Sequence, residues 1–334
     1  MRRLTRRTSQ IAALSALAVV AGGCASVSGA APNADPSATV AQRNTTSPPS
    51  AGGSSSKGST KPGTTPKSTP TPTQTPKPKT KQKSPFGGSV ASYLASTHLY
   101  VTAAIYDRRT GNTFVFNPNP GVTMRTASIV KVEIMGTLFR EHEADHEPLS
   151  ASDESLLTTM IENSDNDSAT ALWDEDGSHS AIQTFDDTIG MTGTTASTDP
   201  FIPGSTTLPG WGWTSTTARD QVTLVKDFAY KNKWIDENYR LQGLRLMEDV
   251  EADQAWGVSG GVPPGVKVAL KNGWLPLDLS NDTDWEMNSI GWVNGDGRNY
   301  VLAILCQGLP NYDSASIAVL DHIGALVYAA MASG

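Results

Sequence analysis

Residues 25–85 consist almost entirely of Ser, Thr, Pro, Gly, Lys and Ala, and they contain almost no large apolar side chains. Such a segment cannot bury enough apolar surface to offset the conformational entropy that folding costs. We therefore expect residues 25–85 to form an unfolded tether, which as a random coil would reach about 45 Å. Only residues 86–334 remain to build a hydrophobic core, and their length suffices for one large domain or two lobes.

Residues 1–24 have the pattern of an export signal. Arginines near the start precede an apolar run from Ile11 to Gly23, which is too short to cross a bilayer. The run ends in "VAGGC", which resembles a lipobox, so Cys24 is expected to be lipidated and to anchor the exported protein to the outer face of the cell membrane. The other cysteine, Cys306, lies in an apolar run and is expected in a buried strand, which leaves no disulfide within the chain.

The part of the chain from residue 85 onward is strongly acidic. It has 14 Lys and Arg against 32 Asp and Glu, a net charge of −18. Because a surface of this sign repels phosphates, we expect no nucleic-acid partner. We expect a monomer.

The pattern of apolar residues predicts extended segments at both ends of the folded part and helices between them. Extended segments around a helical middle indicate an α+β fold, in which N- and C-terminal strands form one antiparallel sheet flanked by helices, with an all-helical lobe inserted. The predicted segments are a helix over 89–97, a hairpin over 98–118, helices between 128 and 250, strands over 266–274, 285–293 and 299–307, and a last helix over 313–332.

The helix predicted from Ser128 carries two motifs with catalytic spacing. Ser128 and Lys131 form Ser-x-x-Lys at its start, and His142, Glu143 and His146 form His-Glu-x-x-His at its end. At 1.5 Å per residue the two ends lie about 27 Å apart, so they cannot share one catalytic centre. At most one of these motifs is an active site.

Helical spacing makes the Ser-x-x-Lys motif chemically competent. Residues i and i+3 share a helix face, so Lys131 can reach the hydroxyl of Ser128. A neutral amine there, favoured by burial and by a nearby positive charge, could take the hydroxyl proton. The motif alone is unspecific, because a serine beside a surface lysine satisfies it equally well.

Two further motifs, one at a predicted helix end and one on a predicted strand, make the set specific. They are Ser164-Asp165-Asn166 and Lys271-Asn272-Gly273. Together with Ser128-x-x-Lys131 they resemble the motifs of class A β-lactamases and penicillin-binding proteins, and the resemblance extends from about Ser89 to the C-terminus. It implies a serine hydrolase that works through an acyl-enzyme and needs no cofactor.

The resemblance also implies a role for each residue. Ser128 would be the nucleophile and Lys131 an acylation base. Ser164 would protonate the departing nitrogen, Asn166 would hold both Lys131 and the substrate amide, and Asp165 would fix the turn.

On the strand, Lys271 would lower the proton affinity of Ser164 and attract a substrate carboxylate. Asn272 replaces the usual hydroxyl residue and could donate to that carboxylate through its amide. Gly273 and Trp274 complete the substrate-binding strand, and the backbone N–H groups of Ser128 and Trp274 would form an oxyanion hole.

The sequence departs from class A β-lactamases where these carry a glutamate that activates the deacylating water. Residues 191–217 contain no glutamate, and Asp199 is the one acid there, so it is the candidate deacylation base. Trp211 and Trp213 occupy the same region. We therefore expect slow deacylation.

The His-Glu-x-x-His motif lacks the features of a zinc site. Zinc requires a third protein ligand and a protected cleft, whereas the sequence around His142 and His146 is charged on all sides and stops at Pro148. We expect no metal and no cleft at this end of the helix.

The sequence thus predicts an exported, lipid-anchored serine hydrolase of the class A β-lactamase type that acts on a β-lactam or a related peptidoglycan-derived amide. Two alternatives remain open. One is a D-alanyl-D-alanine peptidase, and the other is a penicillin-binding sensor or trap that stays acylated.

Overall fold

The computed structural model describes residues 83–280 and 283–333, so the expected export signal, Cys24 and residues 25–82 of the expected tether lie outside the described residues. The helices are α1 (Ser89–Thr97), α2 (Lys131–Asp145), α3 (Ala151–Glu162), α4 (Asn166–Glu175), α5 (His179–Ile189), α6 (Ala218–Ala229), α7 (Glu237–Glu248) and α8 (Ser314–Ala330), with short 3₁₀ turns η1 (Ala127–Val130), η2 (Gly210–Trp213), η3 (Ala252–Gln254) and η4 (Met331–Ser333). The strands are β1 (Tyr100–Asp107), β2 (Asn112–Phe116), β3 (Met124–Arg125), β4 (Ser215–Thr216), β5 (Lys267–Asp278), β6 (Thr283–Gly295) and β7 (Arg298–Leu309).

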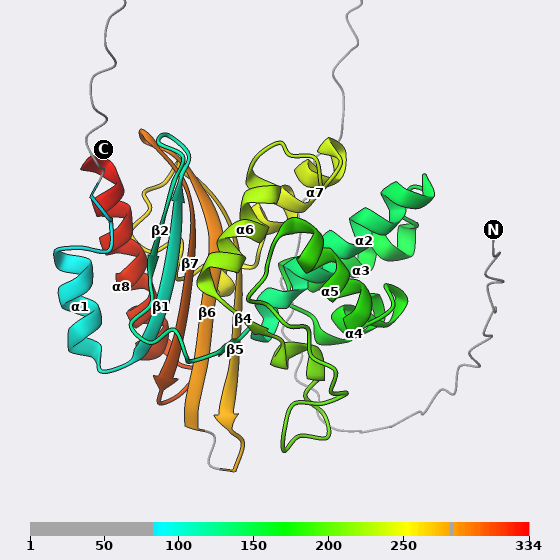
Figure 1. The fold of residues 1–334 in the computed structure, drawn as a ribbon, viewed down its shortest axis with the longest axis horizontal. Helices are drawn as coiled ribbons and strands as arrows, with labels where there is room; N and C mark the ends of the chain where they lie inside the picture. Colours follow the sequence, from blue (N-terminus) through cyan, green and yellow to red (C-terminus); the bar gives the residue numbers. More distant parts are fainter. Residues whose placement is uncertain (1–82, 281–282, 334) are drawn as a thin grey trace, which may run out of the picture. The chain divides into compact units, whose positions relative to one another are not determined.

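The main sheet joins the two ends of the folded part. Its strand order is β2-β1-β7-β6-β5, and the pairs are antiparallel (Figure 1). The first strand pairs with the last, with Tyr100 opposite Gln307. The predicted α+β fold, an antiparallel sheet built from both terminal segments, is therefore confirmed.

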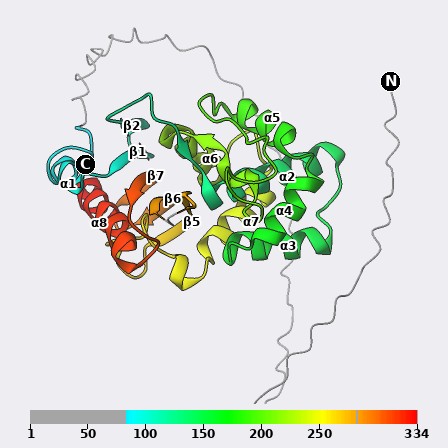
Figure 2. The same cartoon turned by 90° about the horizontal axis from the view of Figure 1, so that it is seen from below.

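Helices cover both faces of the sheet, with α1 and α8 on one face and the inserted lobe on the other (Figures 1 and 2). A hydrophobic core lies on each face of the sheet. Residues of β7 pack alternately into one core and the other, because successive strand side chains point to opposite faces. Leu302, Ile304 and Cys306 pack toward α1 and α8, whereas Val301 and Ala303 pack toward the lobe. Cys306 is a buried strand residue, as predicted.

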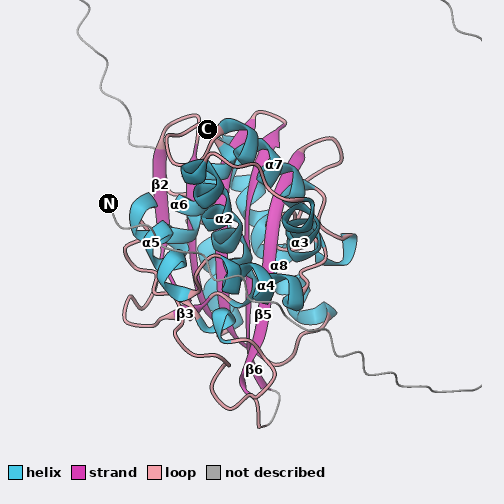
Figure 3. Ribbon diagram, turned by 90° about the vertical axis from the view of Figure 1, so that its right-hand side faces the viewer, coloured by secondary structure: helices cyan, strands magenta, loops and turns pink. Residues whose placement is uncertain are grey.

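The inserted lobe lies against the sheet with α2 near its centre (Figure 3). Gly136 allows α2 to pack closely on α5, because a Cβ at this position would lie 2.4 Å from the Phe185 ring. Among the described residues, no helix combines the length and the apolar character needed to cross a bilayer.

The lobe is not entirely helical, which differs from the prediction. The two-residue strands β3 and β4 pair with each other, with Met124 opposite Thr216 and Arg125 opposite Ser215. Segments this short have no periodicity that a sequence could reveal. Their pairing fixes the chain immediately before Ser128 to the chain immediately after Trp213.

Candidate active site

Ser128 lies in η1, the 3₁₀ turn that runs directly into α2. The α-helix itself begins at Lys131, three residues later than the predicted start, and Ser128 is half-buried. Ala127, the preceding residue, has a φ of 48°. This left-handed conformation is unfavourable for a residue with a Cβ, and such residues cluster at functional sites.

Lys131 is fully buried beneath the turn. Its Nζ donates to the backbone oxygen of Ser164 at 2.5 Å and to Oδ1 of Asn166 at 2.8 Å, and it lies 3.2 Å from the Ser164 hydroxyl. Burial lowers the pKa of Lys131 well below its usual value, and the neighbouring Lys271 lowers it further. A neutral amine able to accept a proton is therefore favoured at this position.

Ser164 occupies the sharp turn between α3 and α4, with a φ of 58°. Asp165 follows as the N-cap of α4, where its carboxylate accepts the Ser168 N–H at 2.7 Å. This cap starts the next helix at Asn166 and so directs the side chains of both Ser164 and Asn166 toward Lys131. The carboxylate of Asp165 is thus engaged in capping α4 and stabilises the turn.

Lys271 reaches the same hydroxyl from strand β5. Its Nζ donates to Oγ of Ser164 at 2.8 Å and to the backbone oxygen of Asn272 at 3.1 Å. Lys271 is fully buried, and this burial lowers its pKa to about 7. The Ser164 hydroxyl therefore lies within hydrogen-bond distance of two buried amines, one from the start of α2 and one from β5.

Gly273 lets strand β5 approach the turn that carries Ser128. A Cβ at this position would lie 2.6 Å from the Ser128 nitrogen and 2.8 Å from the Ile129 nitrogen. No side chain fits there, so glycine is required for this contact. The next residue, Trp274, stacks on Tyr312 with ring centroids 4.4 Å apart.

Asn272 is directed away from the site, which differs from the expectation that its amide binds a substrate carboxylate. Its Nδ2 donates to the backbone oxygens of Gln254 at 2.6 Å and Trp256 at 3.1 Å, and the residue is 1% exposed. Both N–H groups are thus already engaged. The amide fixes β5 to the segment around η3 instead.

Gln254 is a site-supporting residue that the sequence did not reveal. Its side chain donates to the backbone oxygen of Asn163 at 3.0 Å, and its own backbone oxygen accepts from Asn272. It therefore links the turn before Ser164 to the strand that carries Lys271. No motif or periodicity marks this glutamine.

A small cavity of about 60 Å³ opens beside Ser128. Its other lining residues come mainly from the segment before η2 and from β5, and most are apolar: Ala127, Asn166, Ile202, Leu208, Pro209, Trp211, Gly212, Trp274 and Leu275.

Trp211 fills the space beside Lys131. Its indole nitrogen donates to the Thr170 hydroxyl at 3.1 Å, and the Lys131 amine lies 5.1 Å from the ring centroid. Trp213, two residues on, lies beneath the Arg125 guanidinium at 4.7 Å. The sequence located both tryptophans in this region but could not place either ring.

Asp199 is exposed and does not line the cavity at Ser128. Its backbone N–H donates to the Ser197 hydroxyl at 3.3 Å. Among the described residues that line the cavity, Ser128 therefore has no carboxylate from Asp199 beside it.

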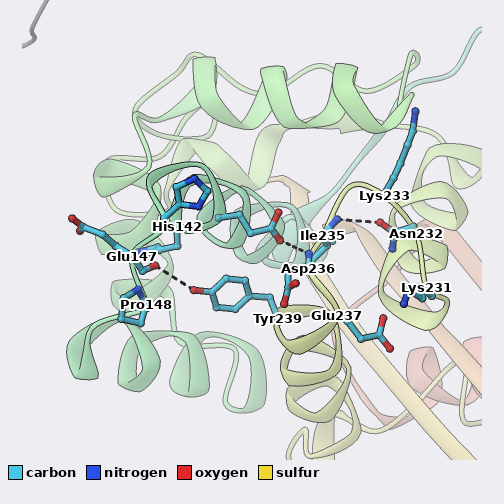
Figure 4. Close-up of a pocket in the computed structure, with 12 residues that line it drawn as sticks. His142, Glu147, Pro148, Lys231, Asn232, Lys233, Ile235, Asp236, Glu237 and Tyr239 are labelled. Carbon is cyan, nitrogen blue, oxygen red and sulfur yellow. Dashed lines mark hydrogen bonds between the residues drawn. The ribbon is translucent and has the colours of Figure 1, made fainter.

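The His-Glu-x-x-His segment borders an open pocket of about 600 Å³ (Figure 4). The expectation that this end of the helix lacks a cleft is wrong, because the segment before α7 packs beside it and forms the other wall. However, α2 ends at Asp145, and His146 has a φ of 57°. The helical geometry that would place His142 and His146 on one face is therefore broken.

His142 has polar neighbours of its own. Its Nδ1 lies 3.2 Å from the backbone oxygen of Glu147, which also accepts from the Tyr239 hydroxyl at 3.4 Å (Figure 4). Its Nε2 lies 3.8 Å from the Asp153 carboxylate. Within residues 83–280 and 283–333, no three His, Cys, Asp or Glu side chains form a group that could hold a metal ion.

Comparison with known proteins relates the chain to one family. A family model described as "Beta-lactamase enzyme family" matches residues 146–331, a range that contains Ser164 and Lys271 and begins after Ser128. LppW, named a presumed lipoprotein in Mycobacterium tuberculosis and Mycobacterium bovis, is 26% identical over 215 residues. The match spans 61% of this chain and 62% of LppW, so the chain spans less than two thirds of that relative.

Solved structures share the fold. A class A β-lactamase from Bacteroides cellulosilyticus superimposes with a TM-score of 0.62 and 17% identity, covering 73% of this chain and 95% of its own. The extended-spectrum β-lactamase TLA-1 superimposes with a TM-score of 0.63 and 16% identity, covering 73% of this chain and 98% of its own. The class A β-lactamase of Mycobacterium abscessus superimposes with a TM-score of 0.58 and 18% identity, covering 72% of this chain and 96% of its own.

Proposed function

The chain belongs to the β-lactamase enzyme family, and we propose that it is a serine hydrolase in which Ser128 attacks a β-lactam or a peptidoglycan-derived amide and forms an acyl-enzyme that is released slowly. The observation that carries this proposal is the position of the Ser164 hydroxyl. It lies within hydrogen-bond distance of both buried amines, 3.2 Å from Lys131 and 2.8 Å from Lys271.

Acylation would proceed by proton transfer through these groups. Neutral Lys131 accepts the Ser128 hydroxyl proton as the oxygen attacks the amide carbon. When the carbon–nitrogen bond breaks, Ser164 gives its proton to the departing nitrogen, and the protonated Lys131 returns one to Ser164. Lys271 supports this step because its amine donates to the same hydroxyl.

The oxyanion of the tetrahedral intermediate would be bound by the backbone N–H groups of Ser128 and Trp274. Support comes from Gly273, whose missing side chain brings β5 against the Ser128 nitrogen. In comparable enzymes one such donor contributes about 3 kcal/mol to transition-state stabilisation.

Deacylation would be slow because the cavity offers no group to activate water. Among the described residues that line it, none carries a carboxylate, and the indole of Trp211 occupies the space next to Lys131. A general base contributes about 10² to 10⁴ in rate, so its loss would lengthen the life of the acyl-enzyme accordingly.

The same observation favours a second candidate function, a penicillin-binding sensor or trap. A site with the acylation groups and without a placed deacylation base would bind one equivalent of substrate and retain it. The lifetime of the adduct distinguishes this function from hydrolysis.

We further propose that the protein acts at the outer face of the cell membrane through a lipid on Cys24. Two findings support this location. The sequence "VAGGC" resembles a lipobox, and the relative LppW is named a presumed lipoprotein.

The proposal is tested by intact-mass spectrometry after incubation with a fluorescent penicillin. We expect one adduct per chain on the parent protein and on Ser92→Ala, a control serine exposed on α1, and none on Ser128→Ala. An adduct on Ser128→Ala at the parental level would refute Ser128 as the nucleophile. A half-life of hours would favour the trap, and one of seconds would favour turnover.

A further inference from the structure

The turn that carries Ser128 is held in a conformation that its own sequence does not favour. Ala127 has a φ of 48°, although a residue with a Cβ avoids the left-handed region. Such a conformation persists only where the surroundings impose it. The groups that bind the preceding residues, Arg125 and Thr126, therefore determine where Ser128 lies.

Two side chains of β6 bind these residues directly. Oε1 of Glu286 accepts the Arg125 N–H at 2.6 Å. Nδ2 of Asn288 donates to the backbone oxygens of Arg125 at 2.8 Å and Thr126 at 3.2 Å. Glu286 and Asn288 are both fully buried and, two residues apart on one strand, point to the same face of the sheet.

The other hydrogen bonds that Thr126 forms are to backbone atoms. Thr126 N–H donates to the Thr214 oxygen at 2.8 Å on the side of β4. On the side of β5, Gly273 lies opposite Asn288 in the sheet and presses on the Ser128 nitrogen. Among the described residues, side chains that form hydrogen bonds with the backbone of Arg125 and Thr126 come only from β6, while the Arg125 guanidinium itself packs over the Trp213 ring at 4.7 Å.

We propose that Asn288 and Glu286 are positioning residues for the nucleophile, which hold the backbone of Arg125 and Thr126 so that Ser128 meets Lys131 and the oxyanion donors. This role rests on the proposed acylation of Ser128. Neither side chain lines the cavity at Ser128, so neither is a catalytic residue.

The expected effect follows from the sensitivity of catalysis to position. A displacement of about 1 Å between reacting groups can lower a rate by about 10²-fold. Asn288→Leu keeps the size of the side chain and removes both of its donors. We expect the limiting rate of acylation to fall by about 10- to 100-fold, with the constant for reversible binding nearly unchanged.

Glu286 offers a conservative rescue. Burial raises the pKa of its carboxyl group well above the usual value, so a neutral amide resembles its buried state. Glu286→Gln keeps an oxygen that can accept the Arg125 N–H and should acylate at nearly the parental rate. Glu286→Leu removes this acceptor and should acylate about 10-fold more slowly.

Asn299→Leu is the matched control. Oδ1 of Asn299 accepts from the Tyr230 hydroxyl at 2.7 Å and from the Trp292 indole at 3.0 Å, so this change also removes two hydrogen bonds. Asn299 pairs with Asn294, six residues along β6 from Asn288, which places it about 20 Å from the turn. Asn299→Leu should therefore lower the midpoint of thermal unfolding without slowing acylation.

The experiment measures the rate of Ser128 labelling by a fluorescent penicillin as a function of probe concentration, with thermal unfolding in parallel. Slow labelling in folded Asn288→Leu, together with parental rates in Asn299→Leu and Glu286→Gln, would support the proposal. Parental rates in Asn288→Leu and Glu286→Leu would overturn it. If Asn288→Leu does not fold, Asn288→Ala is compared in its place under the same criteria. A parent protein that is not labelled at Ser128 would instead refute the proposed function.

Discussion

Replacing Lys131 with methionine should separate catalysis from stability at this site. Lys131→Met keeps an unbranched chain in the buried space beside Trp211 and removes the amine. If the amine is the acylation base, its loss should slow acylation by about 10² to 10⁴, which corresponds to about 3 to 5.5 kcal/mol in the barrier.

The cost to folding should be smaller. The amine now donates to the Ser164 carbonyl and to Oδ1 of Asn166. Because Asn166 is exposed, water can replace the lost donor there, and the Ser164 carbonyl accounts for most of a penalty of about 1 to 3 kcal/mol. Removing a buried amine also relieves the desolvation that lowers its pKa, which reduces this penalty further.

The assay is the pseudo-first-order rate of labelling by a fluorescent penicillin, followed by gel fluorescence and intact mass, with urea unfolding of the same preparations. Lys131→Arg is the companion variant, because it keeps a positive charge but cannot accept a proton near neutral pH. Both variants should label slowly. A folded Lys131→Met that labels at the parental rate would refute the assignment of Lys131 as the base.

Three further predictions concern deacylation, metal and pH. With a chromogenic cephalosporin the parent should give a burst of about one equivalent and then slow turnover, and Asp199→Asn should change the slow phase by less than about twofold; fast turnover that Asp199→Asn abolishes would identify Asp199 as a base after all. Chelation, or the double change of His142 and His146 to Ala, should leave the labelling rate unchanged, and stoichiometric zinc whose removal abolishes labelling would contradict this. Burial lowers the folded pKa of Lys271 to about 7, against about 10.4 for an unperturbed lysine, so the unfolded chain binds more protons between these values and the free energy of unfolding should rise as the pH increases from 7 to 10. In urea titrations the free energy of unfolding of Lys271→Met should rise less over this pH range than that of the parent. An equal rise in both proteins would contradict the lowered pKa of Lys271.

The elements of the fold were largely predictable because their patterns are local. The helix at Ser89–Thr97, the hairpin of β1 and β2, and the three long strands β5 to β7 each carry their own periodicity or turn residues. The strands β3 and β4 carry neither, because each is only two residues long. Their pairing is imposed by the surrounding fold.

The candidate site was predictable to the level of residue types. Ser128 and Lys131 are three residues apart, so their proximity follows from helical spacing alone. Lys271 lies 107 residues beyond Ser164, and no local rule brings their side chains to 2.8 Å. There the resemblance of three motifs supplied what spacing could not.

The sequence could not predict the direction in which each side chain points, and Asn272 illustrates why. Its position in the third motif implied a side chain directed at substrate, whereas packing of the segment around η3 presents two backbone carbonyls that take up its amide. In the same way the pocket beside His142 exists because the chain before α7 folds back against the end of α2.

The sequence by itself determined that residues 25–85 lack the apolar side chains for a core and that the remainder forms an α+β domain. It also determined that this domain contains two serines and two lysines whose order and spacing resemble those of an acylating site. These features were predictable because composition and periodicity are properties of a continuous segment and do not depend on the rest of the fold. Only the tertiary structure decided that the Trp211 ring lies beside Lys131, and that Glu286 and Asn288 form hydrogen bonds with the backbone before Ser128. These contacts join residues 80 or more positions apart, and their geometry is set by how the lobe and the sheet pack together, which no single segment specifies.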